Sequence, residues 1–278
     1  MNWRVIRWIL LIILVLLNLG LFFYSTYTNR QMYVVPRDRI ENVRRQYEAR
    51  GYELPENISN KQYPRHRLLL TPNDLEKRAD AMWTEDYEKS YMPGSRIMYT
   101  CGTETITIDR DQSSMAYLQN EPGEPKEVSE EEAQLMAQEK ARSMMDLQDL
   151  KLIRTLTDEE GTYIFTFCEP YKNEVVFPNR TVVTVSQGTV IRASMVQYQI
   201  QGYDEGTWPI YPIDELLYSC LPSLGQRDEL TELTIYYGYS IKSTEEELVS
   251  CDPSIWLVRP DGTGLLINQL TDTITDIL

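Results

Sequence analysis

The chain has 278 residues, and 42% of them are hydrophobic, which is enough to build a sizeable core. The part beyond residue 24 holds all 42 acidic residues and 25 of the 27 basic ones, so its net charge is −17. This excess of acid argues against nucleic acid or anionic lipid as a partner, because both reward clustered lysine and arginine. The alternative is that the acidic residues serve mainly solubility.

The first segment is predicted to be a membrane-spanning helix. Residues 5–24 are interrupted only by Arg7, Asn18 and Gly20, and a helix of about 20 residues is about 30 Å long, which matches the hydrocarbon layer of a bilayer. A cleaved signal peptide has a shorter apolar region of roughly 7–15 residues and small residues at the cleavage site, whereas residues 21–27 are mostly bulky. We therefore predict an uncleaved signal anchor. A buried core helix is disfavoured because no other segment is comparably apolar.

The charges around this segment indicate its orientation. Arg4, Arg7 and the amino terminus flank its N-terminal side, and positive flanks are retained in the cytoplasm. We expect a single-pass protein of the cell membrane with a cytoplasmic stub at residues 1–4, a transmembrane segment at residues 5–24, and the rest of the chain outside.

The next elements are predicted to be two helices separated by an extended segment. Residues 36–50 enter a helix through Pro36 and leave it at Gly51, and one face of this helix is apolar, with Ile40, Val43 and Tyr47. A second helix is expected from Thr71, which would act as its cap, with a proline at the first helical position.

Strands follow, and then a charged loop. The segments RIMYT, TETITIDRD and SMAYL have the composition and alternation of strands. The loop QNEPGEPKEVSEEE contains two prolines. We take it as the boundary between an N-terminal lobe, residues 25–120, and a C-terminal lobe, residues 121–278.

The C-terminal lobe is predicted to begin with a helix and continue as antiparallel strands. Ser129 and Glu132 form a capping-box pattern, and apolar residues then recur at helical spacing: Ala133, Met136, Ala137, Ala141, Met144 and Leu147. The segments LKLIRTLT, GTYIFTFCEPY, NEVVF, RTVVTVSQG and TVIRASMVQYQIQ form a meander with connections too short for parallel crossovers. A helix over YPIDELLYSCLPSL, a strand and a hairpin complete an α+β fold, in which the two lobes could be related units that pack helices on sheets.

The four cysteines all follow the predicted span, in a compartment where disulfides are permitted: Cys101, Cys168, Cys220 and Cys251. Three pairings are open, and the sequence does not choose among them. Buried free thiols are an equally weighted alternative. No CxxC occurs, so a zinc knuckle is not expected.

No catalytic set is recognisable. His66 is the single histidine and lies between two arginines, so we expect a surface residue rather than a general base. Asp109, Asp111 and Ser113 occupy the first positions of a calcium-loop pattern whose later positions are wrong, so we expect an acidic turn. Asp261 lies in a Pro-Asp-Gly turn. We therefore expect no enzyme activity, no cofactor and no metal. A hydrolase with an unrecognised acidic site is the weakest of our hypotheses.

The N-terminal residues resemble a known family. Met1, Trp3, the stretch Leu17-Asn18-Leu19 within VLLNLGLFF, and the segment RGYELPENI are similar to the YycI family of single-span regulators of the WalK (YycG) sensor histidine kinase. The resemblance implies an α+β body without enzymatic activity. It also implies two partners, the kinase and the related protein YycH, contacted largely through membrane helices.

Carried onto this chain, the resemblance makes four residues candidates for the helix-packing surface: Trp3, Leu17, Asn18 and Leu19. Asn18 independently suits this role, because an amide in lipid seeks a partner on another helix. The leading hypothesis is a membrane-anchored regulator of a cell-envelope two-component system. The alternative, motivated by the helix and meander after Ser129, is an anchored ligand-binding or protease-inhibitory module with PepSY-like units.

Overall fold

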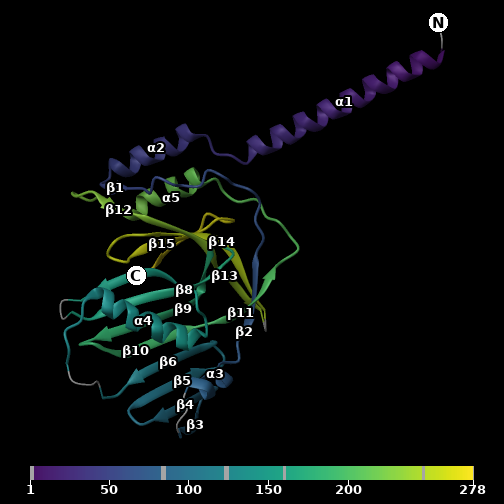
Figure 1. The fold of residues 1–278 in the computed structure, drawn as a ribbon. Helices are drawn as coiled ribbons and strands as arrows, with labels where there is room; N and C mark the ends of the chain where they lie inside the picture. Colours follow the sequence, from purple (N-terminus) through teal and green to yellow (C-terminus); the bar gives the residue numbers. More distant parts are fainter. Residues whose placement is uncertain (1–2, 83–85, 122–124, 159–160, 246–247, 278) are drawn as a thin grey trace.

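The computed structural model describes residues 3–82, 86–121, 125–158, 161–245 and 248–277. A long N-terminal helix precedes a sheet-rich body that carries a few helices (Figure 1). The predicted α+β class is therefore confirmed. Helix α1 (Trp3–Met32) projects away from the body, whereas the other helices lie against it.

Helix α1 contains the predicted span. The segment Ile6–Tyr24 has a mean hydropathy of 2.5, and none of its residues is buried in the body. By length and composition this helix can cross a membrane, and the rest of the chain has the character of a soluble domain. Helix α1 continues for eight residues beyond Tyr24 before it ends at Met32.

Residues 33–36 link α1 to α2 (Arg37–Glu48), and this link forms backbone hydrogen bonds with the body. The backbone N–H of Val35 donates to the carbonyl of Asn60 at 2.8 Å, and the N–H of Gln62 donates to the carbonyl of Tyr33 at 2.9 Å. Val35 itself is only 1% exposed. The chain therefore passes from α1 into the body through a segment with backbone partners and a buried side chain.

Residues 75–196 form what we call the middle lobe. It contains two runs of elements, each a helix followed by a four-stranded antiparallel meander. The first run is α3 (Leu75–Met82), β3 (Glu88–Met92), β4 (Arg96–Cys101), β5 (Glu104–Asp109) and β6 (Ser114–Gln119). The second is α4 (Glu130–Met145), β7 (Lys151–Thr157), β8 (Tyr163–Tyr171), β9 (Glu174–Ser186) and β10 (Thr189–Val196). The two meanders join where β6 pairs antiparallel with β10.

The terminal lobe combines residues 33–72 with residues 198–277. Its helix α5 (Ile213–Leu224) precedes a third antiparallel meander: β13 (Thr234–Glu245), β14 (Leu248–Val258), β15 (Gly264–Asn268) and β16 (Ile274–Ile277). β2 (Leu68–Pro72) and β11 (Tyr198–Tyr203) extend this sheet beside β14, and the short strands β1 (Tyr52–Glu53) and β12 (Thr231–Glu232) pair with each other. The same order, a helix and then a four-stranded meander, thus occurs three times.

Strand β9 belongs to both lobes. Its residues Val175 and Val176 pair parallel with Gly238 and Tyr239 of β13, and its later residues pair antiparallel with β10. Gly238 is required at this joint, because a Cβ atom there would lie 2.0 Å from the carbonyl oxygen of Val175. The β9–β13 and β1–β12 pairs are parallel, in addition to the predicted antiparallel pairs. These strands are far apart in sequence, so no short connection dictates their direction.

Each lobe has its own core beneath its helices. In the middle lobe, small residues of α4 pack against aromatic residues of β8, including Phe165 and Phe167. In the terminal lobe, α2 and α5 pack on β13–β15, and the buried hydroxyl of Tyr47 on α2 donates to the carbonyl of Leu217 on α5 at 2.7 Å. Burying helix faces in this way supplies most of the helices' stability.

Three predicted helices are confirmed. α2 buries the expected apolar face, α5 covers the expected segment, and α4 begins at the predicted capping box. There Ser129 Oγ accepts from the N–H of Glu132, and Glu132 Oε2 accepts from the N–H of Ser129, both at 3.2 Å. The helix predicted from Thr71 begins later, at Leu75, because Thr71 and Pro72 pair with β11 as part of β2.

The predicted strands differ from the structure in three places. β3 is not predicted, because all its side chains are exposed and it lacks an apolar alternation. The segments NEVVF and RTVVTVSQG form the single strand β9, whereas TVIRASMVQYQIQ is divided between β10 and β11. The boundary predicted between residues 120 and 121 falls within the middle lobe, whose core contains residues from both sides of it.

Candidate binding groove

An open groove of about 820 Å³ lies where the two lobes meet. It is formed by sheet faces that the helices do not cover. On β14, Asp252 and Trp256 line the groove, whereas Ile255 and Leu257 point to the opposite face and belong to the core under α2 and α5. The volume lies within the range of about 300–1,000 Å³ that is typical of ligand sites.

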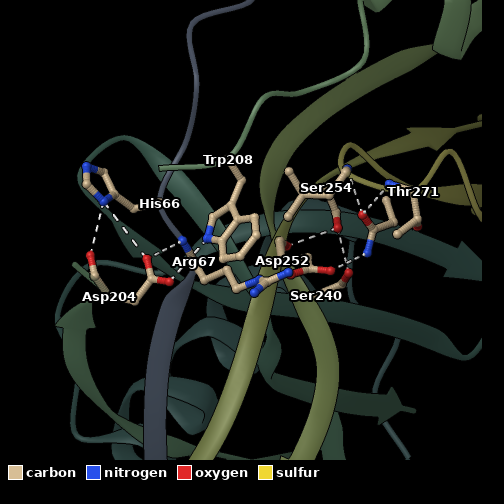
Figure 2. Close-up of polar contacts among 10 residues, drawn as sticks. His66, Arg67, Asp204, Trp208, Ser240, Asp252, Ser254 and Thr271 are labelled. Atoms are coloured by element: carbon tan, nitrogen blue, oxygen red, sulfur yellow. Dashed lines mark hydrogen bonds and ion pairs between the residues drawn. The ribbon is translucent and has the colours of Figure 1, made fainter. Parts of the chain in front are cut away.

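The polar part of the groove is organised by Asp252, whose side chain is 1% exposed. Its Oδ1 accepts a hydrogen bond from Arg67 Nε at 2.7 Å (Figure 2). Its Oδ2 accepts one from Asn268 Nδ2 at 2.9 Å. The hydroxyl of Ser254 donates to the carbonyl of Asp252 at 3.1 Å and lies 2.6 Å from the hydroxyl of Ser240. Asp252 is therefore a buried carboxylate with its charge balanced and both oxygens paired.

Arg67 is held in place from the opposite side by residues of a loop. Asp204 Oδ1 accepts from the backbone N–H of Arg67 at 3.0 Å, and Asp204 Oδ2 accepts from Trp208 Nε1 at 3.3 Å. The guanidinium carbon of Arg67 lies 4.0 Å from the centre of the Trp208 ring, a cation–π arrangement. The loop thus fixes the arginine that neutralises Asp252.

Arg65, two residues earlier, connects the terminal lobe to β9. Its guanidinium pairs with Glu174 at the start of β9, donates to Tyr239 Oη at 2.9 Å and donates to Gln269 Oε1 at 3.0 Å. Arg65 is therefore a polar contact between the lobes, close to the parallel pairing of β9 and β13.

The remaining walls of the groove combine aromatic and basic side chains. Phe177 and Trp256 meet edge to face with ring centres 5.8 Å apart, and burial raises the pKa of Tyr198, with a further contribution from Cys251. Arg180 and Lys242 are exposed at the groove, and neither forms an ion pair with another described residue. Aromatic surface, hydroxyl groups and uncompensated cations suit a polar ligand that carries negative charge.

Of the residues that the sequence singled out for chemistry, Asp111 of the calcium-loop pattern lines the groove, whereas His66, Asp109, Ser113 and Asp261 do not. His66 does not line the groove; its Nδ1 lies 3.1 Å from the carbonyl of Asp204, and its ring stacks on Tyr203. Asp109 pairs with Arg96 at 3.1 Å and accepts from the N–H of Gln112, as in a turn rather than a metal loop. Within the described ranges, no group of three or more histidine, cysteine or acidic residues is arranged to hold a metal ion.

The four predicted packing residues, Trp3, Leu17, Asn18 and Leu19, lie on α1 and are exposed. At about 100° per residue, Trp3 and Leu17 lie about 40° apart around the helix, whereas Leu19 lies about 200° from Leu17. A single partner helix therefore contacts only part of this set. The side-chain amide of Asn18 donates to the carbonyl of Leu14 at 2.9 Å, so one of its hydrogen bonds is made within the helix.

The four cysteines are free thiols in the structure. Three are buried, and they belong to three different hydrophobic clusters: Cys220 on α5, Cys251 on β14 and Cys168 on β8. Burial raises the pKa of each of these three thiols to about 12. Cys101 is half-buried at the end of β4.

Sequence reasoning missed the residues that organise the groove, above all Arg67, Asp252 and Asn268. One signal was available, because Asp252 is a single acid within the long apolar strand segment of β14. A charge in such a segment requires a partner. The partner could not be named, since Arg67 lies 185 residues earlier in the chain.

No protein-family model matches the sequence, and no curated protein matches it. Among solved structures, the chain is similar to an uncharacterized protein from Eubacterium rectale ATCC 33656, with 13% identity and a TM-score of 0.50 over 86% of this chain and 99% of that one. It is also similar to the Bacillus megaterium YpeB C-terminal domain, with 10% identity and a TM-score of 0.42 over 73% of this chain and 96% of that one. The first similarity shows a shared fold only, and the second is too distant to support an inference.

Proposed function

We propose that the chain is a membrane-anchored regulatory protein that modulates a sensor histidine kinase of the cell envelope, together with a YycH-like partner. Its N-terminus lies in the cytoplasm, its body lies outside, and it acts by binding rather than by catalysis. The observation that carries this proposal is helix α1, which exposes an apolar surface to any neighbouring membrane helix. The resemblance of Trp3 and of the Leu17-Asn18-Leu19 stretch to the YycI family supports the choice of kinase.

Regulation by such a protein requires that it bind two signalling states of the kinase with different affinity, because equal affinity shifts no equilibrium. A complete switch from 1:99 to 99:1 takes about 5.5 kcal/mol of differential binding. Contacts along α1 and contacts of the body can each contribute part of this difference in binding free energy.

The test exchanges the membrane helix and leaves the body unchanged. Replacing residues 6–24 by an unrelated apolar helix of equal length should abolish co-purification with the kinase from native membranes. The matched control, Asn18→Leu, should weaken association by only about threefold, since interhelical hydrogen bonds average about 0.6 kcal/mol and this amide already bonds to Leu14. Undiminished association of the exchanged protein would refute contact through the membrane.

The second candidate function is an anchored ligand-binding or protease-inhibitory module, and the groove between the lobes favours it. A double variant, Arg180→Gln with Lys242→Gln, removes the two uncompensated cations without touching the Asp252 network. If this function holds, the variant loses binding of a wall fragment or protease, and the exchange of residues 6–24 does not. The opposite pattern, sensitivity to the helix alone, supports the kinase proposal.

A further inference from the structure

A second recess, of about 320 Å³, lies between β7 of the middle lobe and the strands β13 and β14 of the terminal lobe. It is separate from the groove. The side chains that matter for its chemistry are Arg154, Thr155, Glu232, Thr234, Tyr236 and Arg259. Two arginines, one glutamate and three residues that carry hydroxyl groups therefore line one small cavity.

Both arginines are positioned by the turn that joins β14 to β15. A Cβ atom at Gly262 would lie 2.4 Å from Arg154 Nε, so this guanidinium lies directly against the backbone of the turn. Arg259 Nη1 donates to Thr263 Oγ1 at 2.8 Å. Arg259 Nε is buried and has no hydrogen-bond partner in the described part of the chain. A buried donor of this kind is unfavourable unless something accepts its hydrogen bond.

Positive charge gathers around this turn although the chain beyond residue 24 is strongly acidic. Arg227 Nη2 lies 3.5 Å from Asp261 Oδ2. Burial opposes ionisation of Asp261, but hydrogen bonds from Thr263 and the charges of Arg259 and Arg227 lower its pKa overall. Burial also lowers the pKa of Arg154, and Asp261 offsets this only in part. Asp261 thus interacts with several guanidinium groups.

We propose that this recess binds an oxyanion, a phosphate or carboxylate group, between the guanidinium groups of Arg154 and Arg259. Guanidinium forks match the geometry of such anions, and the hydroxyls of Thr155, Thr234 and Tyr236 add further donors. Since Arg154 lies on β7 and Arg259 follows β14, a bound anion connects the two lobes. The proposal stands independently of the proposed regulatory function.

The test titrates inorganic phosphate into the full-length protein in detergent by calorimetry, at constant ionic strength held with sodium chloride. The wild type should bind one phosphate, and Arg259→Gln and Arg154→Gln should each lower the affinity at least about tenfold, as expected for loss of a charge-assisted contact. Arg192→Gln, which removes an exposed arginine on β10, should leave the affinity unchanged. A parallel titration with acetate distinguishes a carboxylate site from a phosphate site.

The proposal is overturned if neither phosphate nor acetate binds beyond the chloride control. It is equally overturned if both arginine variants retain the affinity of the wild type. Should Arg259→Gln lose its folded circular dichroism spectrum, Thr234→Val is measured in its place, because it removes one donor from the recess and leaves the turn intact. Unchanged phosphate affinity in both Thr234→Val and Arg154→Gln then overturns the site.

Discussion

The sharpest prediction concerns the buried ion pair between Arg67 and Asp252. Replacing Arg67 by methionine leaves a carboxylate that is 1% exposed with Asn268 as its remaining side-chain partner. Removing one partner of a buried pair costs about 3–5 kcal/mol, because the other charge stays buried and uncompensated. At about 2–4 °C per kcal/mol for a body of this size, the melting temperature should fall by roughly 6–20 °C.

The double variant Arg67→Met with Asp252→Leu distinguishes two free energies: the net contribution of the ion pair to stability, and the cost of leaving one buried charge without a partner. Neither charge remains in this protein, so it should be considerably more stable than Arg67→Met alone. Urea unfolding followed by tryptophan fluorescence measures all variants. Arg192→Met serves as the control and should stay within about 0.5 kcal/mol of the wild type. A loss below about 1 kcal/mol in Arg67→Met, or strict additivity in the double variant, would refute the reasoning.

Four further predictions concern the pairing of β9 with β13, the cap of α4 and the thiols. Gly238→Ala should destabilise the protein by about 1–3 kcal/mol or more in urea unfolding, because the new methyl group collides with the carbonyl of Val175. Ser129→Ala should cost about 1 kcal/mol by the same assay, whereas Ser90→Ala on the exposed strand β3 should cost little. Ellman's reagent should titrate one thiol rapidly in the native protein, Cys101, and all four in denaturant; two or fewer in denaturant would show a disulfide. The buried thiols have pKa values raised from 9.0 to about 12, so the folded state retains protons that the unfolded state loses. The free energy of unfolding that these thiols contribute is therefore fully present below about pH 9 and is lost as the pH rises toward 12. Replacing the three buried cysteines by alanine should make this loss of stability at high pH smaller.

The sequence predicts those parts of the fold that depend on neighbouring residues. The capping box at Ser129 and the apolar face of α2 depend on residues within a few positions of each other, and both are confirmed. Thr71 and Pro72 show the limit: their local pattern favours a helix start, but pairing with β11 makes them part of a strand. A distant strand can override a local preference because its hydrogen bonds and burial contribute more than propensity.

The candidate groove is less predictable than the fold, because each of its polar contacts joins distant parts of the chain. Asp252 is recognisable as an anomaly, but its partners Arg67 and Asn268 lie on different strands or at their ends. The recess beside β7 is similar, since it brings together Arg154 on β7 and Arg259 after β14, which are far apart in the sequence. Because tertiary structure brings the residues of the groove and of the recess together, neither site has a recognisable motif in the sequence.

The link between α1 and α2 has a mechanical consequence. A flexible tether would let α1 turn or slide while the body stayed still. Here the link is held by backbone hydrogen bonds at Tyr33 and Val35, and α2 is fastened to α5 through Tyr47. A rotation of α1, or a displacement along its axis, would therefore act on the terminal lobe through these contacts, and on the middle lobe through the pairing of β9 with β13.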